Sequence, residues 1–260
     1  MKMSGNEIFG VGSLKVEELA KRVLEELGHK SPAQSRKGVV DTSIWLANIT
    51  TTSSTYDHDA VMSALLKRGI SRNLLMDCCI PDAARILGDG WMENMRSFGQ
   101  VSLGAVRLQS LAKSLSLEWG EAPFKAEEEG IFLIVCPDDD HTLGPIILAD
   151  QLRRKGYSVN IMIGASDEEL LKTAGSGNFQ LIMFSCSCMV AFEGVKNAAK
   201  LLKTKVQDLP PIVLGGPVLE FFDEGEDIDA EVDLITNEVD IALKKASRKK
   251  LKHRGIERAS

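Results

Sequence analysis

Short apolar runs alternate with longer amphipathic stretches from residue 131 onward. The apolar runs are rich in β-branched side chains and occupy 131–136, 157–164, 179–187, 210–216 and 232–236. Continuous apolar strands indicate burial on both faces, which is typical of a parallel sheet covered by helices. Their strict alternation with helical segments predicts an α/β domain of the flavodoxin-like, Rossmann-type class, with a doubly wound five-stranded parallel sheet.

The first 120 residues have a different pattern, with apolar side chains three and four positions apart. This spacing predicts amphipathic helices. They are expected at 13–28, 57–69, 71–79, 81–91 and 97–119. Pro81 suits the first turn of its helix, and Ser97 suits the N-cap of the next one. The pattern therefore predicts an all-α helical bundle, and the polar segment 31–43 is expected to pack loosely.

These patterns predict a chain organised in five parts. In order, they are a variable, partly helical segment (1–40), a helical bundle cap (41–120), a linker (121–130), an α/β domain (131–246) and a basic tail (247–260). The linker is assigned from its Pro, Gly and acidic residues. Residues 244–258 include eight Lys or Arg. This basic segment is interpreted as a solvated terminal helix, with contact to DNA or to a protein partner as the alternative.

Composition excludes several classes of protein. The 260 residues are 44% hydrophobic and 26% charged, as in ordinary globular proteins, and the net charge of −6 argues against a surface dedicated to nucleic acid or membrane. No apolar stretch approaches the roughly 20 residues of a membrane span, and the polar N-terminus has no signal-peptide core. Five cysteines without Cys-x-x-Cys spacing suggest neither a disulfide framework nor a zinc site. A cytoplasmic protein is expected.

Three segments follow predicted strands and should meet at one edge of the sheet. They are 139–144 after the first strand, 185–187 after the third and 215–216 after the fourth. Ligands of doubly wound sheets bind outside the carboxyl ends of the strands, so these segments can converge on one ligand. Neither glycine-rich phosphate-binding pattern is present. His141 can instead bind a metal through one ring nitrogen while the other donates to Asp139.

The motif D-x-H-x-x-G, followed by S-x-L and G-G, is the signature of cobalamin (B12)-binding domains, which this chain resembles. Here the motif stands as Asp139-x-His141-x-x-Gly144, Ser185-x-Ser187 and Gly215-Gly216. The resemblance implies that His141 ligates the cobalt of cobalamin and that Asp139 polarises it. It also implies that Thr142 and Leu143 contact the cofactor, that the three glycines leave room for the nucleotide tail, and that Ser185 bonds its base. Ser187 replaces the leucine, so that contact is altered.

Residues 88–111 also resemble the cap of AerR/PpaA-type proteins, cobalamin-binding anti-repressors of photosynthesis genes. The shared features are the Trp, the Ser-Phe-x-Gln-Val run and the Arg-Leu-Gln that follows, and the resemblance spans about residues 60–240. It implies a light- or redox-responsive regulator of a PpsR/CrtJ-type repressor, not an enzyme, with adenosylcobalamin, hydroxocobalamin or methylcobalamin as cofactor. Trp91, Phe98 and Gln100 would face the upper side of that cofactor.

Other interpretations of these features stay open. Trp91, Met92, Met95 and Phe98 have helical spacing and could instead be core residues, and Gln100 could cap a turn. Cys186 and Cys188 are expected to be small buried residues. The alternative functions are a corrinoid methyl carrier serving a methyltransferase, although the Phe-Leu-Pro-Glu stretch of such caps is absent, and a B12 storage or delivery module.

Overall fold

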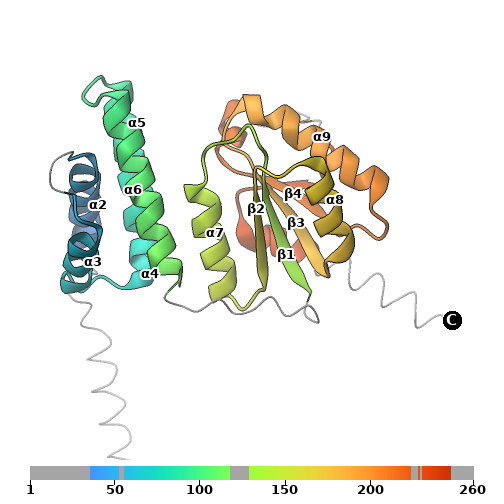
Figure 1. The fold of residues 1–260 in the computed structure, drawn as a ribbon, viewed down its shortest axis with the longest axis horizontal. Helices are drawn as coiled ribbons and strands as arrows, with labels where there is room; N and C mark the ends of the chain where they lie inside the picture. The colour runs from blue at the N-terminus through green and yellow to red at the C-terminus, as the bar shows by residue number, and fades with distance from the viewer. Residues whose placement is uncertain (1–35, 53–55, 118–128, 224–227, 229, 247–260) are drawn as a thin grey trace, which may run out of the picture. The chain divides into compact units, whose positions relative to one another are not determined.

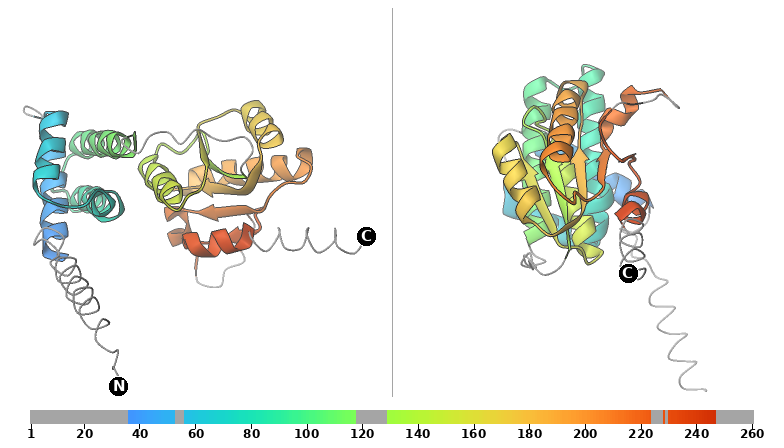
Figure 2. Two further views of the ribbon diagram at one scale, coloured as in Figure 1. Left: turned by 90° about the horizontal axis from the view of Figure 1, so that it is seen from below. Right: turned by 90° about the vertical axis from the view of Figure 1, so that its right-hand side faces the viewer.

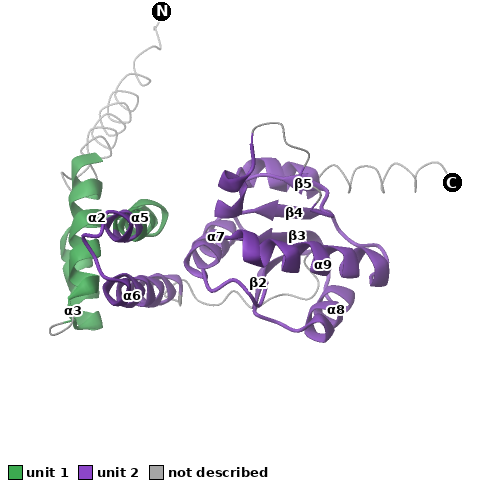
Figure 3. Cartoon of the chain, turned by 90° about the horizontal axis from the view of Figure 1, so that it is seen from above, with its two compact units in different colours: residues 1–86 green, residues 87–260 purple. Residues whose placement is uncertain are grey.

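The computed structural model describes residues 36–52, 56–117, 129–223, 228 and 230–246. The chain divides into two compact units, residues 1–86 and 87–260 (Figure 3). This division falls inside helix α5 (Ile80–Met92), not at the predicted linker. Most of that linker, the expected helix at 13–28 and the tail 247–260 lie outside the described residues, so the predicted domain boundaries stay predictions.

A five-stranded sheet forms the centre of the α/β domain (Figure 1). Its strands are β1 (Gly130–Val135), β2 (Val159–Ile163), β3 (Phe179–Ser185), β4 (Ile212–Gly215) and β5 (Leu234–Ile235). The strand order is β2-β1-β3-β4-β5 and every neighbouring pair is parallel. This is the flavodoxin-like order, so the predicted fold class is confirmed.

Helices cover both faces of this sheet, as Figures 1 and 2 show. They are α7 (Leu143–Arg154), α8 (Asp167–Ser176), α9 (Met189–Lys205) and a helix over 239–246. All of β1 is buried: Ile131 and Leu133 pack toward α7 and the helix over 239–246, while Phe132 and Ile134 pack toward α8 and α9. Because successive side chains alternate between faces, both sides of the strand must be apolar.

Helix α8 begins with a capping box formed by Ser166 and Glu169. Ser166 accepts a hydrogen bond from the backbone N–H of Glu169, and the Glu169 carboxylate accepts one from the backbone N–H of Ser166. This is the reciprocal capping box that the Ser-x-x-Glu spacing predicts. The backbone N–H and the hydroxyl of Ser166 both donate to the Glu169 carboxylate, and they lower the pKa of Glu169 because they stabilise its ionised form.

The N-terminal part of the described chain is helical, as expected. Its helices are α2 (Arg36–Thr51), α3 (His58–Lys67), α4 (Arg72–Leu74), a π-helical turn η2 (Leu75–Cys79), α5 (Ile80–Met92) and α6 (Phe98–Leu117). Asp57 caps α3 by accepting a hydrogen bond from the N–H of Ala60. None of the helices in the described ranges is both long and apolar enough to cross a membrane.

Helix α2 corrects the expectation of loose packing over 31–43. Its described part begins at Arg36, and Thr42, Ser43 and Thr50 are buried in it. The Ser43 hydroxyl donates to the carbonyl of Val39, and the Thr50 hydroxyl donates to that of Leu46. These bonds to the preceding turn satisfy the hydroxyls inside the helix, so polar residues can be buried there.

Pro81 lies in the first turn of α5, as predicted, but α5 is not separated from the helical turns before it. Residues 72–92 are helical throughout, and the turn before Pro81 widens into η2, where the N–H of Ile80 bonds to the carbonyl of Leu75. Proline has no N–H to donate, and its ring clashes with the carbonyl four residues earlier. A wide π-helical turn gives the chain room to continue past the proline.

Candidate functional site

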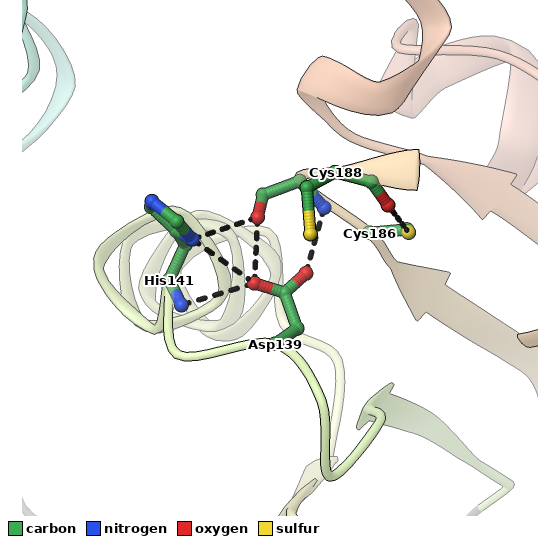
Figure 4. A network of polar contacts seen from close by, with 5 residues as sticks. Asp139, His141, Cys186 and Cys188 are labelled. Carbon is green, nitrogen blue, oxygen red and sulfur yellow. Dashed lines mark hydrogen bonds and ion pairs between the residues drawn. The ribbon is translucent and has the colours of Figure 1, made fainter. Parts of the chain in front are cut away.

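Asp139 and His141 lie together in the loop between β1 and α7 (Figure 4). The Asp139 side chain is 1% exposed, whereas that of His141 is 75% exposed. Oδ1 of Asp139 accepts a hydrogen bond from the backbone N–H of His141 at 3.0 Å, and it lies 3.3 Å from Nδ1 of the imidazole. The buried carboxylate therefore holds an imidazole that reaches solvent, while Asp138 and Asp140 are exposed.

Ser187, which follows β3, completes a polar network with this pair. Its backbone N–H donates to Oδ2 of Asp139 at 2.7 Å, and its hydroxyl donates to Oδ1 at 2.6 Å. The same hydroxyl lies 2.9 Å from Nδ1 of His141. Asp139 thus ties together two loops that are 48 residues apart in the sequence. The sequence assigned Ser187 only an altered cofactor contact and gave no sign of these bonds.

A cavity of about 310 Å³ opens on the α7 side of the same sheet edge. Its lining includes four of the predicted site residues, Gly144, Ser185, Gly215 and Gly216. Asn237, which the sequence analysis missed, also lines it and accepts a 2.6 Å hydrogen bond from the N–H of Gly216. Because Asn237 directly follows the last predicted strand, at the same sheet edge, the sequence could have identified it as a site residue. The cavity is therefore lined by residues from all three loops that were predicted to converge.

The three glycines of the motif have different physical roles. A Cβ at Gly144 would meet no atom within 4 Å, so this residue borders open space. A Cβ at Gly215 would lie 2.8 Å from the carbonyl oxygen of Thr236, and one at Gly216, where φ is +115°, would overlap the carbonyl oxygen of Cys186. Only Gly144 therefore leaves room toward the cavity. Gly215 and Gly216 are required by the close approach of the protein's own backbone.

The predicted cap residues lie at the junction of α5 and α6. Trp91 is 52% exposed and Phe98 is 71% exposed, and their rings meet edge to face with centroids 6.4 Å apart. Met92 and Met95 are exposed as well, so the alternative of core residues is wrong for all four side chains. Gln100 forms a capping box with Ser97: its Oε1 accepts from the Ser97 N–H, and the Ser97 hydroxyl accepts from the Gln100 N–H.

Thr142 and Leu143 begin α7, directly after His141. Thr142 is the N-cap residue but makes no side-chain capping bond, and Leu143 is the first helical residue. Both are half-buried. Because α7 begins at Leu143, two residues after His141, the start of the helix limits where the His141 side chain can lie.

The cysteines behind the site are thiols with little tendency to ionise. Cys136 and Cys186 are buried, as expected for Cys186, whereas Cys188 is half-buried. Burial raises the pKa of Cys136 to about 12 and that of Cys186 to about 11. The Cys186 thiol donates to the carbonyl of Cys188 at 3.4 Å. These two buried thiols therefore act as small packing groups rather than as nucleophiles.

Comparison with known families identifies the domain that contains these residues. The family model of the B12 binding domain matches residues 131–246, which span the sheet, its helices and all three loops. This part of the chain is a B12-binding domain. Its cofactor is cobalamin, as the motif implied, and the B12-binding domain includes the Asp139–His141–Ser187 network and the cavity beside Gly144.

One curated protein and one solved structure extend the comparison beyond the B12-binding domain. A 20.5 kDa protein of Rhodobacter capsulatus, described as lying in the bchF-crtJ intergenic region, is 28% identical over 169 residues, which are 65% of this chain and 88% of that protein. The monomethylamine corrinoid protein of Methanosarcina barkeri superimposes with a TM-score of 0.59 at 16% identity, covering 83% of this chain and 98% of that one. The second likeness concerns the fold alone.

The residues of the B12-binding domain fit a corrinoid cofactor. An exposed imidazole with its Nδ1 side engaged by Asp139 and Ser187 can offer Nε2 to a metal. The open space at Gly144 continues into a cavity with polar groups from Ser185 and Asn237, which suits an elongated tail with a heterocyclic base.

Proposed function

We propose that this protein is a cobalamin-binding regulator, not an enzyme, that acts in the cytoplasm on a transcriptional repressor of the PpsR/CrtJ type. One observation is central to the proposal: the exposed imidazole of His141 is held from behind by Asp139 and Ser187, next to an open cavity. In this assignment His141 would bind cobalt, and Gly144, Ser185, Gly215 and Gly216 would line the space for the nucleotide tail.

The exposed aromatic pair supports a sensing role for the helical part. Trp91 and Phe98 present apolar surface that a folded protein normally buries, as do Met92 and Met95. In the proposal these side chains contact the upper face of the cofactor, and Gln100 is placed by its capping box at the start of the same helix. An alkylcobalamin supplies a cobalt–carbon bond that light breaks, which gives the input.

The repressor partner is supported by the Rhodobacter capsulatus relative. That protein is described as lying in the bchF-crtJ intergenic region, next to crtJ, and the repressor proposed here is of the CrtJ type. The acidic net charge of −6 disfavours direct binding of the chain's surface to DNA, which leaves a protein partner as the route to transcription. The basic segment 244–258 is the part of the sequence where a contact with DNA could supplement binding to the repressor.

The test begins with the purified chain loaded with adenosylcobalamin in the dark. We expect an absorption change on illumination, together with a change in the affinity for a CrtJ-type repressor measured by biolayer interferometry. His141→Ala should lose the spectrum of histidine-ligated cobalamin, whereas His58→Ala, a histidine of the helical part, should keep it. Identical spectra and cobalamin affinities for His141→Ala and the unaltered chain would contradict the assignment.

A corrinoid methyl carrier is the second candidate. The fold of the Methanosarcina barkeri monomethylamine corrinoid protein, matched over 83% of this chain, favours it. Methyl transfer from a methylamine donor and a partner methyltransferase onto the reduced cofactor would support the carrier. A light-independent complex with neither methyl transfer nor repressor binding would instead point to storage or delivery of B12.

A further inference from the structure

A second cavity lies on the other face of the sheet, between α8 and α9. Its volume is about 260 Å³, and it shares no lining residue with the cavity beside Gly144. Its apolar lining includes Ile134, Met162 and Leu170, which belong to the core on this face. The loop that carries His141 also contributes to it, through Asp138. The domain therefore has a separate small cavity at the same edge of the sheet.

Gly194 keeps part of this cavity open. It lies inside α9, where glycine is the least favourable residue apart from proline. A Cβ at this position would lie 3.5 Å from Cβ of Cys136, 3.9 Å from its sulfur and 4.0 Å from Oδ2 of Asp138, which are ordinary contact distances. Alanine would therefore fit, so close packing does not require the glycine. The missing side chain instead leaves space between a thiol and a carboxylate.

The Cys136 thiol is a buried polar group in the wall of this cavity. The residue is 4% exposed, and among the residues that the structure describes its sulfur has no hydrogen-bond partner. The Cys186 thiol, by contrast, donates to the carbonyl of Cys188. Burial is the main cause that raises the pKa of Cys136, and the charges of Asp138 and Asp167 add to it. The thiol therefore stays protonated, and its sulfur can accept a weak hydrogen bond from a ligand.

Two carboxylates stand at the mouth of the cavity. Asp138 follows β1 and Asp167 is the first residue of α8, and both side chains are exposed. Within the described ranges neither forms an ion pair, and none of the residues that line the cavity is basic. Asn197 of α9 adds an amide to the same lining. The lining thus carries two negative charges without a positive one, which favours a cationic ligand.

We propose that this cavity binds a small aliphatic amine in its protonated form. The ammonium group bonds to Asp138 and Asp167, and the aliphatic chain packs against the apolar wall. The volume lies below the roughly 300–1,000 Å³ of most ligand pockets, so the ligand is compact. A hard divalent cation fits less well, because it needs about six or more oxygen ligands and gains nothing from an apolar wall. The inference goes beyond the proposed function and does not depend on it.

The first measurement titrates the full chain, without cobalamin, with pentylamine at pH 7, where the amine is protonated. The reporter is the ¹³C-labelled methyl group of Met162, whose signal among the nine methionines is identified by Met162→Leu. We expect a saturable shift of this signal. Pentanol has the same chain without the charge and should bind about 10-fold more weakly. Equal affinities, no shift with the amine, or a response to CaCl₂ alone would overturn the proposal.

The second measurement fills the cavity. Gly194→Ala places a methyl group between the Cys136 sulfur and Asp138, and it should weaken amine binding by about 10-fold or more. Its urea midpoint should stay equal or rise, because alanine favours the helix. Gly175→Ala is the matched control, since it makes the same change in α8 where a new Cβ meets no atom within 4 Å. Unchanged amine binding in folded Gly194→Ala would refute the proposal.

The third measurement tests the charges and the independence of the site. Asp138→Asn and Asp167→Asn should each weaken binding of the amine but not of pentanol. Asp140→Asn and Glu168→Gln remove neighbouring charges outside the lining and should change neither. Equal losses in these controls would show general attraction to negative charge and no site. Amine binding should also persist with hydroxocobalamin added, and displacement by it would overturn a separate site. Failure of the chain to bind hydroxocobalamin would contradict only the proposed function.

Discussion

Replacing Asp139 with asparagine should destabilise the cofactor-free protein by about 2–4 kcal/mol, because the site needs two acceptor oxygens in a buried place. Oδ1 accepts from the N–H of His141 at 3.0 Å and from the hydroxyl of Ser187 at 2.6 Å, while Oδ2 accepts from the N–H of Ser187 at 2.7 Å. Asparagine has one acceptor oxygen and one NH₂ donor. In either orientation its NH₂ group faces a backbone N–H that it cannot satisfy.

The magnitude follows from these contacts. Each hydrogen bond to a charged group contributes about 1.5–3 kcal/mol, and a buried donor left without a partner costs about 1–3 kcal/mol. Two lost bonds would cost about 3–6 kcal/mol, and rotation of the Ser187 hydroxyl recovers part of this, so a loss of about 2–4 kcal/mol is expected.

Asp140→Asn is the matched control, since it makes the same chemical change one residue away on an exposed side chain. Exposed substitutions of this kind usually stay within about 0.5 kcal/mol. Urea unfolding is followed by far-UV circular dichroism, which reports directly on the helices and strands of the α/β domain, since Trp45, Trp91 and Trp119 all precede that domain in the sequence. Equal unfolding midpoints for the two variants would refute the buried-acceptor argument.

Two further predictions concern the glycines and the buried thiols. In the same urea assay, Gly216→Ala should cost more than about 2 kcal/mol because of its positive φ and the overlap with Cys186, whereas Gly144→Ala should be neutral or stabilising by up to about 1 kcal/mol. The reverse order would contradict the assigned roles. At pH 8, a thiol with the pKa of Cys136, about 12, is only about 10⁻⁴ ionised. Iodoacetamide should therefore modify Cys136 and Cys186 only after unfolding, as mass spectrometry can establish, and rapid labelling of the folded chain would argue against their burial.

The sheet and the convergence of its loops could be predicted because both depend on pattern alone. Burial on two faces requires continuous apolar strands, and each predicted run overlaps an observed strand. Parallel strands bring their carboxyl ends to one edge, so residues near 140, 186 and 216 had to approach each other once the strand order was flavodoxin-like.

Helix α2 and the turn before Pro81 could not be predicted from local preference. Thr and Ser are weak helix formers whose hydroxyls compete with the backbone, yet Thr42, Ser43 and Thr50 are helical because packing buries them and the preceding turn accepts their protons. Proline likewise suggested a helix start at residue 81. The wide turn η2 avoids the steric clash of the proline ring, so the helix continues through Pro81 without a break. No local sequence pattern predicts such a turn.

The role of Ser187 was hidden for a different reason. Compared with the family motif, a serine in place of a leucine indicates a lost apolar contact. Only the three-dimensional structure places its hydroxyl between a carboxylate and an imidazole that stand 48 and 46 residues earlier. Distances between loops depend on strand register and on where each loop turns, which the order of polar and apolar residues does not specify.

The same network separates the groups that hold the fold from His141, the residue proposed to bind cobalt. Asp139 joins two loops through bonds to backbone N–H groups, so its removal weakens the domain itself. The imidazole of His141 is largely exposed, and the backbone N–H of that residue, which bonds to Asp139, remains in His141→Ala. If His141→Ala loses cobalamin, the loss would therefore be attributable to the missing proposed ligand, whereas a loss in Asp139→Asn would combine a misplaced imidazole with a weakened domain. Only the histidine variant can isolate ligation from folding.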